Sequence, residues 1–236
     1  MAHSEQSFGK KLRNAQDIIT FVQGFTNYAP PRTQETLVAM QTLLTSVISA
    51  NATEATNRQQ YRAAVDARTT AFSKGTNSIS KLIVAIRAAV DAQYGKNSAE
   101  SSSIQSILRT IRAGKSVSTP SKTEGEEAAQ AVSRSQRSYG SQTQLFNNLV
   151  NTLNQLPGYN PSNPAIKIAA LQTFVTQLTT LNNAVAQKFA ALQSARANRM
   201  VLYTDLNDRT QRVKSYVKSQ YGQVSNEYKL IKGISA

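Results

Sequence analysis

The sequence predicts an all-α protein made of two tandem, pseudo-symmetric antiparallel helical bundles, each containing one long helix of about 36–40 residues. The first observation behind this prediction is an apolar heptad stripe that runs through residues 168–203 without a Gly or a Pro. Such a stripe is typical of a long helix that needs other helices alongside it. The second observation is a near-repeat of the sequence. The third is a hydrophobic content of 40%, which favours thin bundles with much surface.

The repeat is found when the sequence is compared with itself. Residues that match 131 positions apart are Ser7 and Ser138, Tyr28 and Tyr159, Asn51 and Asn182, and Arg68 and Arg199. Residues 74–77 have no counterpart, and beyond them the offset is 127, which places Gln93-Tyr94-Gly95 on Gln220-Tyr221-Gly222. We interpret this pattern as an internal duplication, with one helical bundle in residues 1–111, a flexible linker in residues 112–127 and a second bundle in residues 128–236.

The first copy is predicted to begin with two helices of unequal length. The first helix covers residues 4–25 and ends before a pair of prolines, because proline cannot continue a helix. Thr33 is expected to cap the long second helix, and Glu35 in its first turn complements the helix dipole. Residues 75–78, which include a Gly, then break the chain.

A third helix is predicted over residues 79–94, with Gly95 as its C-cap. Asn97 and Glu100 have the spacing of a capping box. We therefore expect a short fourth helix that ends at Ile111.

The second copy is predicted to repeat these elements with a longer first turn. Its elements are a helix over residues 128–153, a turn over 157–164, the long helix over 165–204, a third helix over 205–221 and a short tail over 225–234. Between the copies, residues 114–127 hold Ser, Thr, Pro, Lys and Glu with almost nothing to bury, which is typical of a linker.

One polar residue interrupts the apolar stripe at the same place in each copy, Asn51 in the first and Asn182 in the second. An Asn on such a stripe costs stability but fixes helix register, because its amide is satisfied only opposite a suitable partner. The alternative is that both Asn side chains face a wet groove, since the neighbouring stripe positions Arg58 and Arg196 are polar as well.

The C-terminal part of the sequence carries Ala195-Arg196-Ala197-Asn198-Arg199, then Val213-Lys214-Ser215-Tyr216-Val217-Lys218 and Tyr221-Gly222. Together with the turn Tyr159-Asn160-Pro161, these motifs resemble an uncharacterised group of bacterial proteins whose C-terminal half ends in this way. The resemblance covers roughly a third of the chain, and it weakens in the first copy, where only Arg68 matches the basic pair. It implies a duplicated helical-bundle fold and no particular chemistry.

Residue types used in catalysis and metal binding are scarce. The sequence has no Cys and a single His, His3, near a terminus that we expect to be mobile. Thiol chemistry and the common His or Cys metal sites are therefore excluded. Asp205 and Asp208 are expected to act as caps or as partners of nearby Arg side chains. We expect no enzyme activity, no catalytic residue, no cofactor, no bound metal and no small-molecule substrate.

Charge is the strongest functional signal. The formal net charge is +14, and the basic surplus grows toward the C terminus. The candidate polyanion-binding residues are Arg196, Arg199, Arg209, Arg212, Lys214, Lys218, Lys229 and Lys232. A basic excess of this size favours acidic protein surfaces, nucleic acid or anionic lipid. The alternative is that these side chains form an ordinary solvated face.

No stretch of the sequence is apolar enough to span a membrane, and the first residues lack the hydrophobic region of a secretory signal. We therefore expect a cytoplasmic protein without a transmembrane segment.

Two function classes fit these observations. The first is a non-enzymatic structural or interaction protein, a scaffold whose basic face docks an acidic partner or which self-associates. The alternative is a sequence-tolerant DNA- or RNA-binding protein that uses the basic C-terminal repeat. In that case Tyr203, Tyr216, Tyr221 and Tyr228 offer stacking surfaces. Packing within the bundle is the favoured interpretation of these Tyr residues.

Overall fold

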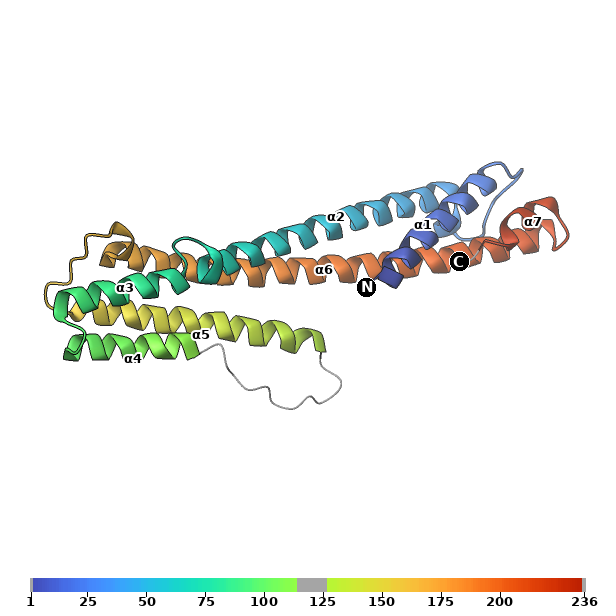
Figure 1. The fold of residues 1–236 in the computed structure, drawn as a ribbon. Coiled ribbons are helices and arrows are strands. Elements are labelled where there is room, and N and C mark those ends of the chain that lie inside the picture. Colours follow the sequence, from blue (N-terminus) through green and yellow to red (C-terminus); the bar gives the residue numbers. More distant parts are fainter. Residues whose placement is uncertain (1, 114–126, 235–236) are drawn as a thin grey trace. The chain divides into compact units, whose positions relative to one another are not determined.

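The computed structural model describes residues 2–113 and 127–234 (Figure 1). The described residues form helices and no strand, which confirms the all-α class. The α-helices are α1 (Ala2–Gln23), α2 (Leu37–Thr69), α3 (Ile79–Tyr94), α4 (Ala99–Ala113), α5 (Glu127–Gln155), α6 (Ile168–Tyr221) and α7 (Asn226–Lys232). Nearly all of the predicted linker, residues 112–127, lies outside the described residues.

The chain forms two compact units, and each unit combines sequence from both predicted repeats. Unit 1 consists of residues 1–59 and 190–236, and unit 2 consists of residues 60–189. Helices α2 and α6 each contribute one part to each unit. The compact units therefore differ from the division predicted at residues 111 and 128.

The core of unit 2 is built from α3, α4, α5 and the beginning of α6. Phe146 of α5 and Ile86 of α3 are fully buried in it, together with Leu171 of α6. Helix α4 contacts both α3 and α5, as Figure 1 shows. The ring of Phe174 meets Phe146 edge to face, with 5.7 Å between the ring centroids, a favourable aromatic geometry.

The core of unit 1 is built from α1, the first part of α2, the end of α6 and α7. Ile18 of α1, Val217 of α6 and Ile231 of α7 lie buried in one cluster. Val47 of α2 and Leu206 of α6 lie in a neighbouring cluster. Helix α1 also contacts α7. These apolar positions recur every three or four residues along each helix, as burial of one helix face requires.

Within unit 1, α2 and α6 run antiparallel. The side-chain amide of Asn51 donates a hydrogen bond to the Tyr203 hydroxyl at 2.8 Å. Six residues further along α2, Asn57 donates to the carbonyl of Ala191 at 3.4 Å, twelve residues earlier in α6. Partner numbers fall along α6 as they rise along α2, which defines the direction of the pairing.

The prediction of a separate third helix over residues 205–221 is wrong. Helix α6 continues without a break for 54 residues, through the predicted boundary. In the first half of the chain, α2 passes into a π-helix, η2 (Thr70–Lys74), before residues 75–78 break the helix. Residues 74–77 have no counterpart in the second half. Without these residues the second half lacks the break, and the helix continues.

Two helix N-caps differ from the prediction by one to three residues. Thr33 begins a 3-10 turn, η1 (Thr33–Glu35), and the hydroxyl of Thr36 accepts from the backbone N–H three residues further on at 3.4 Å. In the same way Ser98, rather than Asn97, accepts from the N–H three residues on at 3.0 Å. A capping side chain acts from the residue directly before the first helical one, and the helices begin later than predicted.

Tyrosines 131 positions apart make the same local hydrogen bond. The hydroxyl of Tyr28 donates to the carbonyl of Glu35 at 2.8 Å, and that of Tyr159 donates to the carbonyl of Ile166 at 3.1 Å. Burial raises the pKa of both phenols, that of Tyr159 to about 12. An ordinary phenol is already protonated at neutral pH, and the raised pKa extends the pH range over which both hydroxyls donate.

A second set of equivalent hydrogen bonds joins the two predicted repeats within each unit. In unit 2, Gln93 donates to the carbonyl of Gly158 at 2.6 Å, and Tyr94 donates to that of Pro157 at 3.0 Å. In unit 1, the equivalent Gln220 donates to the carbonyl of Asn27 at 2.6 Å, and Tyr221 donates to that of Thr26 at 2.8 Å. In every pair, donor and acceptor come from different repeats. Each unit is therefore held together by both halves of the sequence.

The glycine that follows each donor pair gives a stability test. Gly95 has φ +91° and Gly222 has φ +92°, a conformation that L side chains rarely adopt. We expect Gly95→Ala and Gly222→Ala each to lower the free energy of unfolding by about 1–2 kcal/mol. Gly9 lies inside α1 with open space around it, so Gly9→Ala is the control. Urea denaturation measures all three, and equal midpoints for the three variants would contradict this turn geometry.

Candidate functional site

The eight candidate polyanion-binding residues all belong to unit 1, but the structure divides them into separate groups. Arg196 and Arg199 lie near the middle of α6, beside Glu54 of α2. Arg209 pairs with Asp205 through two hydrogen bonds of 2.6 and 2.8 Å. Arg212 is exposed. It is two positions from Lys214, so it points about 200° away from it around the helix.

The remaining four cations gather around α7. The ammonium group of Lys214 donates to the carbonyls of Lys232 and Ile234 at 3.2 and 2.6 Å. That of Lys218 lies 5.9 Å from the ring centroid of Tyr228. Lys229 and Lys232 are exposed on α7 itself. We call the three exposed residues Lys218, Lys229 and Lys232 the C-terminal basic surface.

The acidic content of this region is low. Between residues 209 and 234 the sequence has six basic side chains, and Glu227 is its single carboxylate. Within the described residues, no ion pair joins a carboxylate to Lys218, Lys229 or Lys232. The positive charges of the C-terminal basic surface are therefore not neutralised by ion pairs within the described part of the chain.

The four Tyr residues considered for base stacking are engaged in packing. Tyr203 is buried, with its ring centroid 4.5 Å from that of Phe8. The hydroxyls of Tyr216 and Tyr221 donate to backbone carbonyls of the turn after α1. Tyr228 lies beneath Lys218. These rings are part of the unit 1 core and its edges.

Glu54 is a buried charged residue that the sequence analysis did not single out. Its side chain is 1% exposed, and it pairs with Arg58 on α2 and with Arg196 and Arg199 on α6, the last two at 3.2 and 3.6 Å. Burial alone would raise the pKa of Glu54, but hydrogen bonds from Arg58 and Arg196 and the charge of Arg199 outweigh it and lower the pKa. The negative charge of Glu54 therefore offsets the repulsion among the three neighbouring Arg side chains.

A sequence signal for Glu54 exists. The heptad stripe of α2 includes Met40 and Val47, and the next position in the same series is Glu54. In the second half the equivalent residue is Val185, which is buried and apolar. A carboxylate in an apolar series indicates a buried ion pair.

The stripe residues Asn51 and Asn182 are both partly paired. Asn51 donates to Tyr203, and Asn182 donates to the hydroxyl of Thr143 at 3.1 Å. The side-chain oxygen of each Asn is buried without a hydrogen-bond partner. Each amide thus has one specific partner on another helix, a geometry compatible with the predicted role in helix register.

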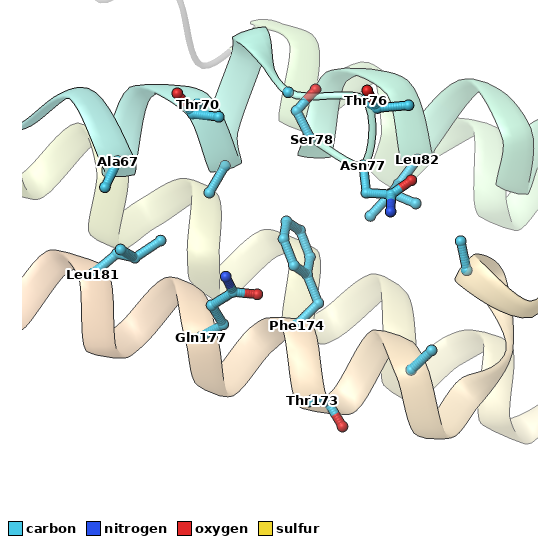
Figure 2. A pocket seen from close by; sticks show the side chains of 14 residues that line it. Ala67, Thr70, Thr76, Asn77, Ser78, Leu82, Thr173, Phe174, Gln177 and Leu181 are labelled. Carbon is cyan, nitrogen blue, oxygen red and sulfur yellow. The ribbon is translucent and has the colours of Figure 1, made fainter.

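Unit 2 contains a groove of about 620 Å³. Its walls are the end of α2, the turn at residues 75–78 and the beginnings of α3 and α6 (Figure 2). Ala71, Leu82 and Phe174 supply apolar surface, and the carboxamides of Asn77 and Gln177 come from opposite walls. None of the fourteen lining residues carries a charge. This size falls within the range of small-molecule sites.

Two broad classes of site find no support in the described ranges. No helix among residues 2–113 and 127–234 is long and apolar enough to cross a membrane. In the same ranges, no group of three or more His, Asp or Glu residues is placed to hold a metal ion. Comparison with protein-family models, curated proteins and solved structures finds no match to this chain. The resemblance to a bacterial protein group stays a prediction.

The Glu54 cluster gives a second stability test. Glu54→Gln removes the one negative charge that faces Arg58, Arg196 and Arg199, so we expect it to lower the free energy of unfolding by about 2–3 kcal/mol. The lowered pKa means that Glu54 stabilises the fold above its ordinary pKa of 4.5, and that this contribution is lost as the pH falls further. The difference between wild type and E54Q should therefore shrink below about pH 4.5 in urea titrations.

Unit 2 suggests the matched control. The positions equivalent to Glu54, Arg58 and Arg196 in that unit are Val185, Phe189 and Val65. A triple variant E54V/R58F/R196V should recover much of the lost stability, because well-packed apolar residues can replace a buried ion cluster. A triple variant no more stable than E54Q would contradict the equivalence of these positions.

Proposed function

We propose that this chain is a non-enzymatic structural or interaction protein built from two copies of one helical unit. In this proposal the copies exchange halves, so that each compact unit combines the N-terminal part of one copy with the C-terminal part of the other. The equivalent hydrogen bonds of Gln93 and Gln220, and of Tyr94 and Tyr221, support it. Each of these bonds joins one copy to the other.

The exchange can be tested by cutting the chain. We expect a protein with a protease site in place of residues 114–126 to keep its two fragments together after cleavage, because each unit needs core residues from both. The fragments should co-elute in size-exclusion chromatography and retain the helical circular dichroism of the intact chain. Fragments that separate as two folded monomers would contradict the exchange and favour two independent tandem bundles.

We propose further that the C-terminal basic surface docks an acidic protein surface. Its three exposed Lys side chains lie on α6 and α7, where the local sequence is nearly free of carboxylates. An acidic protein is favoured over nucleic acid because Tyr203, Tyr216 and Tyr221 are engaged in packing. These three rings are therefore not free to form the stacking platform that single-stranded nucleic acid usually needs.

Charge reversal tests this docking surface. We expect K218E/K229E/K232E to bind poly-glutamate about tenfold more weakly than wild type in fluorescence anisotropy at low salt, because three favourable charges become repulsive. The control is K81E/K96E/K167E, which reverses three exposed Lys residues of unit 2 and gives the same net charge. Equal losses in both variants would show attraction to net charge alone. Tighter binding of duplex DNA, lost in the same variant, would favour the nucleic-acid alternative.

A further inference from the structure

Two residues that line the unit 2 groove have side chains of different volume from those at the equivalent positions in the second half of the chain. Ala71 and Leu82 line the groove, and the equivalent positions in the second half hold Leu202 and Arg209. In unit 1 the guanidinium group of Arg209 reaches across and donates to the carbonyl of Gln34 at 3.2 Å. The larger side chains thus occupy the corresponding place in unit 1. At these two positions the side chains of unit 2 are the smaller ones.

The inserted residues shape one wall of the groove. Residues 74–77 are present in the first half alone, and Asn77 is the last of them. Its neighbour Ser78 is fully buried, and its hydroxyl has no hydrogen-bond partner. The π-helix η2 directly precedes residues 75–78, and its last hydrogen bond runs from the N–H of Gly75 to the carbonyl of Thr70 at 2.7 Å. π-Helical turns occur often at functional sites.

The groove offers two kinds of recognition. Ala71, Leu82 and the half-buried ring of Phe174 present apolar surface. Asn77 and Gln177 lie on opposite walls in Figure 2, and neither side chain has a hydrogen bond within the described part of the chain. A carboxamide both donates and accepts hydrogen bonds. This pair therefore matches a ligand whose polar edge carries a donor and an acceptor. The uncharged lining would leave a ligand's charge without a partner.

We propose that this groove binds an uncharged small molecule with a flat apolar body and a carboxamide-like edge. The apolar body lies against Phe174 and Leu82, and the polar edge exchanges hydrogen bonds with Asn77 and Gln177. Binding without turnover is proposed. It is independent of the C-terminal basic surface, because the two sites belong to different units.

Benzamide and benzoate form a matched pair of probes for this site. They have nearly the same shape, but benzoate is an anion and should associate with this basic chain wherever cations are exposed. In a ¹H–¹⁵N titration of the full chain, we expect benzamide to shift the signals of Gly75 and of the Asn77 and Gln177 side chains, with a dissociation constant of about 1 mM. Benzoate should bind there at least about tenfold more weakly.

Two variants separate loss of the site from loss of folding. Ala71→Leu introduces the residue found at position 202 and should weaken benzamide binding by about tenfold or more, because it fills the groove. Its control is Ala52→Leu, the same change at an exposed site on α2 in unit 1. Gln177→Ala changes an exposed residue and should weaken binding by about three- to tenfold without unfolding the protein.

Three results would overturn the proposal. The first is the absence of benzamide shifts at these signals up to about 20 mM. The second is equal affinity for benzamide and benzoate at the groove. The third is unchanged benzamide affinity in both A71L and Q177A relative to A52L. None of these outcomes bears on docking at the C-terminal basic surface, which is measured with a different probe.

Discussion

Burial of the apolar stripes of α2 and α6 is the constraint on which the rest of the structure depends. A lone helix cannot shield one face from water, so each stripe needs side chains from other helices. In unit 1, Val47 of α2 and Leu206 of α6 belong to one cluster, although they are far apart in the sequence. In unit 2, Leu171 and Leu178 of α6 pack into a core that includes residues of α3 and α5. Neither unit has a complete core without both halves of the chain.

The sequence could predict the helices because their signals are local. The heptad spacing, the prolines after α1 and Gly95 after α3 predict where helices run and stop to within a few residues. The pairing of segments could not be predicted in the same way. A stripe indicates that a helix needs a partner, but the stripe is the same whether the partner belongs to its own repeat or to the other. The continuity of α6 could not be predicted for a related reason. The sequence shows that the second half has no counterpart of residues 74–77, but it does not show that the helix then continues without a break.

The candidate sites show the same limit. The cations were grouped by their nearness in sequence, yet Arg212 and Lys214 point in very different directions because a helix turns about 100° per residue. The ion cluster of Glu54 is hard to predict because two of its three Arg partners lie on α6, far away in the sequence. The groove is lined by Ala71 of η2 and by Ala165 of the 3-10 turn Pro164–Ile166, and only the folded chain brings these two distant positions to one place.

If the two halves are copies, the positions at which they agree indicate the shared fold, and the positions at which they differ indicate features specific to one unit. The shared hydrogen bonds of Tyr28 and Tyr159 hold equivalent turns, so they belong to the structure that the two halves have in common. The differences fall elsewhere. Unit 1 has an ion cluster around Glu54 where the equivalent position in unit 2 is Val185, and unit 2 has a groove at Ala71 where the equivalent position is Leu202. A homodimer of one copy would carry every such feature twice. Joining the copies in one chain allows each unit to change independently, and one groove and one basic surface can then coexist in a single protein.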